Sequence, residues 1–156
     1  MSADAEMLAR AAELVREKFG DEITTALILG SGLGGLADRI ENAISVPYRA
    51  IPGFPSSNVP GHAGRFVAGT LGTRRVIVAA GRYHRYEGHS LETVAMPTRV
   101  LHACGVRTLF VSNAAGGINR PLRAGDLMSS EAHLHLLSST PLAGPPRRGE
   151  ARVAAR

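Results

Sequence analysis

The fold is decided by the run Ala26-Leu27-Ile28-Leu29, which passes directly into Gly30-Ser31-Gly32-Leu33-Gly34-Gly35. A short apolar run of this kind predicts a buried parallel strand, and the glycines allow a turn whose backbone N–H groups face outward. Such amides can hold an anion. A helix over residues 33–40 would strengthen the preference for phosphate through its free amides and its dipole. We therefore expect a phosphate-binding turn, to which Ser31 adds a hydroxyl.

Two other interpretations of this turn remain open. Gly30, Gly32 and Gly35 also satisfy the dinucleotide-binding spacing G-x-G-x-x-G, which needs an acidic residue about 20 residues further on to hold a ribose. Residues 49–55, Arg-Ala-Ile-Pro-Gly-Phe-Pro, contain no carboxylate. The other interpretation is a purely structural glycine turn. The residues favour phosphate binding over both.

The composition indicates one globular domain. The chain has 156 residues, of which 44% are apolar, and this is enough for a hydrophobic core. Cys104 is the single cysteine, and the first residues lack both the basic and the apolar region of a secretory signal. No apolar run approaches the ~18 residues of a membrane span. We therefore expect a cytoplasmic protein that does not interact with membranes.

The positive charge does not indicate a nucleic-acid partner. The formal net charge is +5, but four arginines and one glutamate in the last sixteen residues supply +3 of it. Aromatic residues make up only 4% of the chain, whereas nucleic-acid surfaces interleave basic and aromatic side chains on one face. We therefore expect no nucleic-acid binding.

Helical and strand-like segments alternate along the chain, which predicts an α/β fold with a mostly parallel mixed sheet flanked by helices. In the predicted helix over residues 90–104, His102 lies on the apolar side of the pattern and is predicted to be a core histidine. The predicted helices cover residues 3–19, 33–40 and 90–104, the last interrupted at Pro97. The predicted strands cover residues 24–29, 43–48, 65–69, 74–80 and 108–111.

Polar or glycine-rich turns follow three of these strands, at residues 30–35, 81–88 and 113–117. Ligands of parallel sheets bind beyond the carboxyl ends of the strands. Arg82 offers a planar fork of donors to a phosphate, and His84 shares its side if the strand continues. The alternative is an exposed arginine and a solvated histidine without function. The convergence of Ser31 and the amides of residues 114–116 on the same edge favours the anion site.

Three further residues near these turns carry possible functions. Tyr86 brings a hydroxyl that could contact a sugar or a phosphate. For Glu87 a structural role is favoured, as a partner of Arg85. His62 lies between Gly61 and Gly64, and a ligand contact and a plain loop histidine are equally open for it.

Four segments, in this order, resemble the purine nucleoside phosphorylases of the trimeric type. The resemblance spans residues 26–126, and the methylthioadenosine phosphorylases resemble the chain less closely in the first glycine turn. The segments are Gly30-Ser31-Gly32-Leu33-Gly34, Val59-Pro60-Gly61-His62-Ala63-Gly64, Gly81-Arg82-Tyr83-His84-Arg85-Tyr86-Glu87-Gly88 and Asn113-Ala114-Ala115-Gly116-Gly117.

The resemblance implies a nucleoside phosphorylase fold and the reversible phosphorolysis of purine ribo- or deoxyribonucleosides to free base and pentose 1-phosphate. It implies a homotrimer whose ligands are a purine nucleoside and inorganic phosphate, the co-substrate, with no metal and no organic cofactor. The residues it implies are Ser31, Arg82, His84 and the amide of Ala114 for phosphate, Tyr86, Ala115 and Gly116 for the nucleoside, and His84 and His62 as catalytic residues.

The resemblance degrades after Met128. We therefore divide the chain into the N-terminal part of a phosphorylase domain, residues 1–128, and a diverged, Arg/Pro-rich tail, residues 129–156. The later half of the family has no counterpart here, so we expect a sheet that lacks its C-terminal part. The alternative function is that of a truncated, non-catalytic remnant that binds phosphate or nucleoside.

Overall fold

The computed structural model describes residues 3–55, 64–134, 136 and 139–142. Residues 1–116 and 117–156 form two compact units, and the predicted division after residue 128 remains a prediction. The elements of the first unit are α1 (Ala3–Phe19), β1 (Thr25–Ile28), η1 (Gly34–Arg39), β2 (Glu41–Pro47), η2 (Tyr48–Ala50), β3 (Arg65–Leu71), β4 (Arg74–Ala80), η3 (Arg85–Glu87), α2 (Leu91–Ala103) and β5 (Thr108–Val111).

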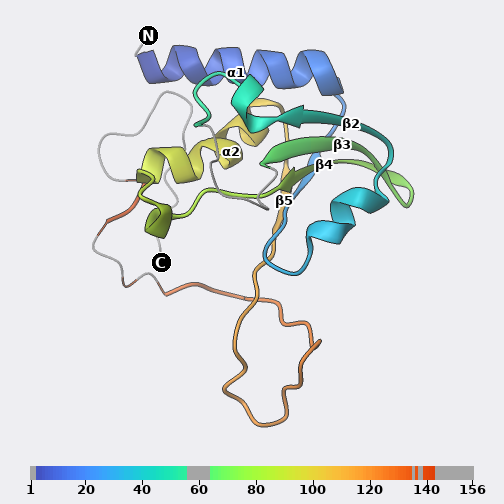
Figure 1. Cartoon of the computed structure of the whole chain (residues 1–156), viewed down its shortest axis with the longest axis vertical. Coiled ribbons are helices and arrows are strands. Elements are labelled where there is room, and N and C mark those ends of the chain that lie inside the picture. The colour runs from blue at the N-terminus through green and yellow to red at the C-terminus, as the bar shows by residue number, and fades with distance from the viewer. Residues whose placement is uncertain (1–2, 56–63, 135, 137–138, 143–156) are drawn as a thin grey trace. The chain divides into compact units, whose positions relative to one another are not determined.

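The strands form one mixed sheet in the order β2-β3-β4-β1-β5 (Figure 1). β1 pairs in parallel with β4 and with β5, whereas β3 pairs antiparallel with β2 and with β4. Because β2 and β4 are both antiparallel to β3, four of the five described strands run in one direction. This confirms the predicted fold class. β3 and β4 form an antiparallel hairpin.

The two faces of the sheet are covered by different elements because strand side chains alternate with a period of two. Phe66 and Ile77 belong to the larger core cluster, together with residues of α1 and α2 such as Val15 and Leu101. Their sequence neighbours on β3 and β4 turn the other way, into a smaller cluster with residues of η1. That cluster is Leu29, Ala37, Ile40, Val67, Val76 and Val78. In Figure 1, α1 and η1 lie on opposite sides of the strands.

Helix α2 differs from the prediction in two ways. It runs without a break through Pro97, which is buried, so the packing of this residue compensates for the backbone hydrogen bond that proline removes. His102 is exposed, and its assignment as a core histidine is wrong. The buried stripe contains Pro97, Val100, Leu101 and Cys104, at helical spacing, and position 102 is turned away from it. Ser90 caps the start of the helix, because its hydroxyl accepts from the Thr93 N–H at 3.2 Å.

In the second unit, the described residues form neither helix nor strand. Two turns order residues 119–126, with backbone bonds from Leu122 to Asn119 at 3.0 Å and from Asp126 to Arg123 at 3.1 Å. Its large apolar side chains are mostly exposed: Ile118, Leu127, Met128, Leu134, Leu136 and Leu142.

Neither of the two α-helices found among the described residues is long and apolar enough to cross a membrane.

The outer edge of β5 is expected to make the chain self-associate. Among the described strands β5 pairs only with β1, and its side chains Phe110 and Val111 are 58% and 60% exposed. An unpaired apolar edge is a template for pairing with another chain. We expect sedimentation velocity to show masses above 16.4 kDa that grow with concentration and have no fixed stoichiometry.

Val111→Lys should reduce this association, while Ile44→Lys, a matched change at an exposed site on the opposite edge strand β2, should leave it unchanged. A monomer at every concentration would contradict the expectation.

Candidate functional site

The carboxyl ends of the three parallel strands β1, β4 and β5 meet around Ser112. The Ser112 N–H donates to the Ile28 carbonyl at 3.0 Å, and its hydroxyl donates to the same oxygen at 3.3 Å. The hydroxyl also accepts from the Gly30 N–H at 3.0 Å. From the end of β4, Arg82 Nη1 donates to the Ser112 carbonyl at 2.9 Å. We call Gly30, Arg82 and Ser112 the strand-end junction.

Gly30 allows this close approach because it has no side chain. A Cβ atom at position 30 would lie 2.4 Å from the Ser112 carbonyl oxygen and 2.7 Å from the Asn113 Cα. Both are backbone atoms, so no side-chain rotation could relieve the overlap. The first glycine of the turn is therefore required for packing of the β5 end against the β1 end.

The turn after Gly30 is exposed, and a short helix follows it. Gly32 has a φ of +84°, and the Leu33 N–H closes the turn on the Gly30 carbonyl at 3.2 Å. The Ser31 hydroxyl lies on this exposed turn. The predicted helix over residues 33–40 is instead a 3₁₀ helix of six residues, η1. Because so short a helix carries little dipole, the groups that this turn offers to an anion are its amides and Ser31 rather than a helix N-terminus.

Arg82 and His84 do not share a strand face. β4 ends at Ala80, so the period-two argument that placed both side chains on one side does not apply. The Arg82 side chain reaches the Ser112 carbonyl in the strand-end junction. The His84 ring instead stacks on the Tyr86 ring, with 4.7 Å between centroids and 17° between planes. A guanidinium has five N–H donors, so the bond from Arg82 to Ser112 leaves donors for an anion.

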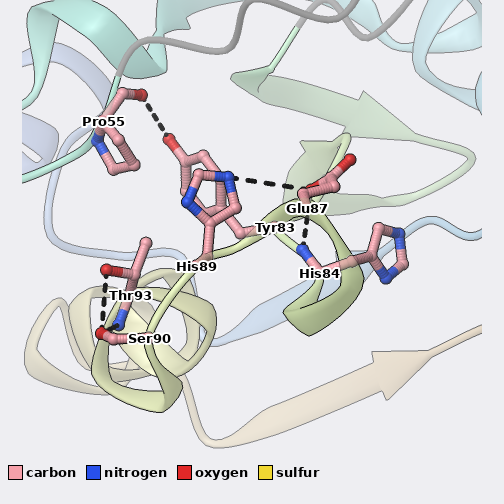
Figure 2. Close-up of polar contacts among 7 residues, drawn as sticks. All are labelled: Pro55, Tyr83, His84, Glu87, His89, Ser90 and Thr93. Atoms are coloured by element: carbon pink, nitrogen blue, oxygen red, sulfur yellow. Dashed lines mark hydrogen bonds and ion pairs between the residues drawn. The ribbon is translucent and has the colours of Figure 1, made fainter.

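Glu87 has a structural role, but its partners differ from the expected one. Its carboxylate accepts from the backbone N–H of His84 at 2.9 Å and lies 3.8 Å from Nε2 of His89 (Figure 2). The predicted pairing with Arg85 is therefore wrong. Because Glu87 is three residues beyond His84 at the end of η3, it can cap the backbone at the start of this turn.

Two buried tyrosines anchor the segment that follows β4. The Tyr48 hydroxyl donates to the Gly81 carbonyl at 2.8 Å, and the Tyr83 hydroxyl donates to the Pro55 carbonyl at 2.9 Å. Burial raises the pKa of Tyr83 to about 12, so this hydroxyl remains a neutral donor at physiological pH. Arg82 and His84 therefore flank an anchored position of the backbone.

The other predicted residues lie beyond these anchored parts or outside the described structure. Ala114, Ala115 and Gly116 are exposed in the segment that follows β5, where the Asn113 side chain donates to the Ala114 carbonyl at 3.1 Å. Tyr86 is 81% exposed. His62 lies outside the described residues.

Sequence reasoning assigned no role to Ser112, although this residue links β1, β4 and β5. The available signal was a hydroxyl residue placed directly after the apolar strand Thr108–Val111. A small polar side chain at a strand end can satisfy backbone groups of the neighbouring strand. Its partners, Ile28 and Gly30, are more than 80 residues away in the sequence, so only the structure identifies them.

Replacing Ser112 by alanine is expected to lower the free energy of unfolding by about 1–2 kcal/mol, because the Gly30 N–H loses its partner inside the strand-end junction. Urea denaturation measures the change. Ser45→Ala, at an exposed position of β2, is the control and should stay within about 0.5 kcal/mol of the parent. Equal stability of the two variants would show that the junction does not depend on this hydroxyl.

Residues 24–155 match the family model of the phosphorylase superfamily. Among curated proteins, purine nucleoside phosphorylase 1 of Geobacillus stearothermophilus is 50% identical over 136 residues, covering 87% of this chain and 50% of the relative. The purine nucleoside phosphorylase of Rattus norvegicus is 45% identical over 139 residues, covering 87% and 48%. The chain thus spans about half the length of the curated relatives it matches.

Solved structures show the same likeness. A purine nucleoside phosphorylase in complex with ribose-1-phosphate aligns with a TM-score of 0.72 and 45% identity, covering 81% of this chain and 46% of that one. The Schistosoma mansoni purine nucleoside phosphorylase in complex with inosine aligns with a TM-score of 0.71 and 44% identity, covering 81% and 44%.

Proposed function

The chain belongs to the phosphorylase superfamily, and from this we propose that it carries the phosphate-binding part of a purine nucleoside phosphorylase active site. The reaction is the reversible phosphorolysis of purine ribo- or deoxyribonucleosides. A phosphate oxygen bonds to C1′ of the sugar as the bond from C1′ to the purine nitrogen breaks. The bonding electrons leave with the purine, which takes up a proton, and pentose 1-phosphate remains.

The strand-end junction is the observation that carries this proposal. It holds Arg82, the glycine turn and the β5 end together at the carboxyl edge of the sheet, the edge at which parallel sheets bind ligands. Curated relatives at 45–50% identity are purine nucleoside phosphorylases. This combination favours an anion site that serves pentosyl transfer.

In the proposed site, phosphate is both the nucleophile and the counter-charge to an oxocarbenium-like transition state, so the protein acts chiefly by positioning and electrostatics. Arg82 supplies charge and a fork of donors, and Ser31 supplies a hydroxyl from the exposed turn. The assigned roles are phosphate binding for Ser31, Arg82, His84 and the Ala114 amide, nucleoside binding for Tyr86, Ala115 and Gly116, and catalysis for His84 and His62.

The chemistry of this reaction needs only its two substrates. Pentosyl transfer to phosphate changes no oxidation state, and the co-substrate itself is the nucleophile, so we propose that no metal or organic cofactor takes part. A homotrimer, which the family resemblance implies, and a cytoplasmic location, which is expected from the sequence, complete the proposal.

A second candidate is a protein that binds phosphate or nucleoside without turning it over. It is favoured by the coverage of the relatives, since the chain spans about half of their length. Ala115 and Gly116, the residues assigned to the base, also have no side-chain hydrogen-bond donors. Both candidates share the same phosphate site, and a measurement of base release from inosine or guanosine separates them.

Phosphate titration of the purified chain in a calorimeter tests the site. We expect Arg82→Ala to weaken phosphate binding by about tenfold to a hundredfold, because a hydrogen bond to a charged group contributes about 1.5–3 kcal/mol. Arg82→Lys should bind with intermediate affinity, because it keeps the charge and loses the fork.

Arg49→Ala, which removes an exposed arginine on η2, is the matched control and should bind like the parent. No heat from the parent chain, or parent-like binding by Arg82→Ala, would refute the assignment.

A further inference from the structure

The turn after β4 contains a group of three side chains to which the proposed reaction assigns no role: Tyr83, Glu87 and His89. We call it the Glu87 bracket. The Glu87 carboxylate accepts a hydrogen bond from the His84 N–H at 2.9 Å, and the same oxygen lies 3.8 Å from Nε2 of His89. The His89 ring in turn meets the Tyr83 ring edge to face, with 5.0 Å between centroids and 74° between planes. Figure 2 shows the three side chains grouped beside the His84 backbone.

The Glu87–His89 pair is more shielded from water than the pairs Arg16–Asp21, Lys18–Glu17 and Arg65–Asp38. The side chains of Glu87 and His89 are 17% and 24% exposed, whereas the carboxylate in each of the other pairs is at least 69% exposed. Exposed pairs contribute little to structure because water and salt screen them. A pair that is largely withdrawn from water is screened less, so the attraction between its partners is stronger when the histidine carries its proton.

Tyr83 connects this pair to the hydrophobic core. Its side chain is 4% exposed, and its ring packs against those of Tyr48 and Phe54, at 5.6 Å and 6.2 Å between centroids. His89 therefore rests on a rigid part of the core, and Glu87 connects it to the His84 backbone. The His84 ring itself lies outside the bracket, stacked on the exposed Tyr86. The direction in which this ring points thus depends on the backbone that Glu87 holds.

We propose that His89 is a positioning residue for the anion site: it holds Glu87 against the His84 amide and so fixes the backbone from which the His84 imidazole reaches the anion. The inference rests on the proposed function, because it takes His84 as a phosphate ligand. It adds to that function a residue that does not itself contact phosphate, sugar or base.

Two substitutions at His89 separate its polar contact with Glu87 from its packing on Tyr83. His89→Phe keeps an aromatic ring on Tyr83 but removes the nitrogen that faces Glu87. His89→Gln replaces the ring by an amide whose nitrogen can reach the position of Nε2. His102→Gln is the matched control, because it removes an exposed imidazole from α2 outside the bracket. Thermal melts establish that each variant is folded.

Sulfate titration is the first measurement. We expect His89→Phe to weaken sulfate binding by about threefold to tenfold, His89→Gln to recover most of the loss, and His102→Gln to match the parent. If His89 acts through Glu87, the double variant Glu87→Gln/His89→Phe should bind no more weakly than Glu87→Gln alone. Parent-like binding by His89→Phe, or additive losses in the double variant, would overturn the proposal.

Hydrogen exchange of the His84 amide is the second measurement, and it needs no ligand. Loss of the His89 contact should loosen Glu87 and speed exchange of this amide by about threefold or more in His89→Phe but not in His102→Gln. If the parent chain binds no sulfate, the proposed phosphate site fails, and exchange still decides whether His89 holds the His84 backbone through Glu87. An unchanged exchange rate of the His84 amide in His89→Phe would then overturn this role of His89, while a faster exchange rate would support it.

Discussion

Replacing Gly30 by alanine is expected to lower the free energy of unfolding by about 3 kcal/mol or more, a larger loss than Ser112→Ala should cause. The new Cβ would lie 2.4 Å from the Ser112 carbonyl oxygen and 2.7 Å from the Asn113 Cα. Relief of this overlap requires the end of β5 to move away from β1. That movement breaks the bond between the Gly30 N–H and the Ser112 hydroxyl, so phosphate binding should be lost as well.

Gly34→Ala is a matched control in the same glycine turn. No atom outside the local chain lies within 4 Å of a Cβ built at Gly34, so this substitution should change the free energy of unfolding by no more than about 0.5 kcal/mol. Urea denaturation and circular dichroism of the two variants make the comparison. A Gly30→Ala chain that is as stable as Gly34→Ala would show that the ends of β1 and β5 do not pack this closely.

The 156-residue chain, given inosine or guanosine with phosphate, is expected to release base at a rate close to background. Cleavage of the glycosidic bond leaves negative charge on the purine, and stabilisation of that charge needs donors at the base ring. Ala115 and Gly116 have no side-chain donors, and removal of one preorganised donor typically lowers kcat by about 10²–10³. Losses of groups that act as a unit are not additive, but one such loss already leaves a poor enzyme.

Chromatographic detection of released hypoxanthine or guanine measures this rate. Addition of a separately expressed later half of a full-length relative should raise it, and His84→Ala should abolish the gain. An ordinary phosphorylase rate from the chain alone, lost in His84→Ala, would contradict the expectation. It would show that other groups of the chain, such as His133, supply the missing contacts.

The sheet could be predicted because local patterns determine it. Val67 and Val78 face one side of the sheet and their neighbours Phe66 and Ile77 the other, and this alternation is visible in the sequence. Glycine turns then mark where the strands end. Since parallel strands end at a common edge, the meeting of the three turns followed from the strand assignments alone.

The departures from prediction arise where contacts between distant segments outweigh local patterns. Pro97 remains helical because it is packed in the core, although its local effect is to break a helix. Ser112 acquires its role from Ile28 and Gly30, which only the folded chain brings near it. Glu87 has several polar neighbours in the sequence, and only the backbone of its turn selects His84 as the partner. These partners depend on the three-dimensional arrangement of the chain, which the spacing of residues in the sequence does not determine.

A crystal structure of the chain with sulfate or phosphate tests the central claim most directly, namely that the ends of β1, β4 and β5 together form an anion site. We expect one anion bound between the turn at Ser31 and the Arg82 guanidinium, with the His84 ring and the Ala114 amide turned towards it. An anion bound only at the arginines of the C-terminal segment, with no density at Ser31 and Arg82, would contradict the account.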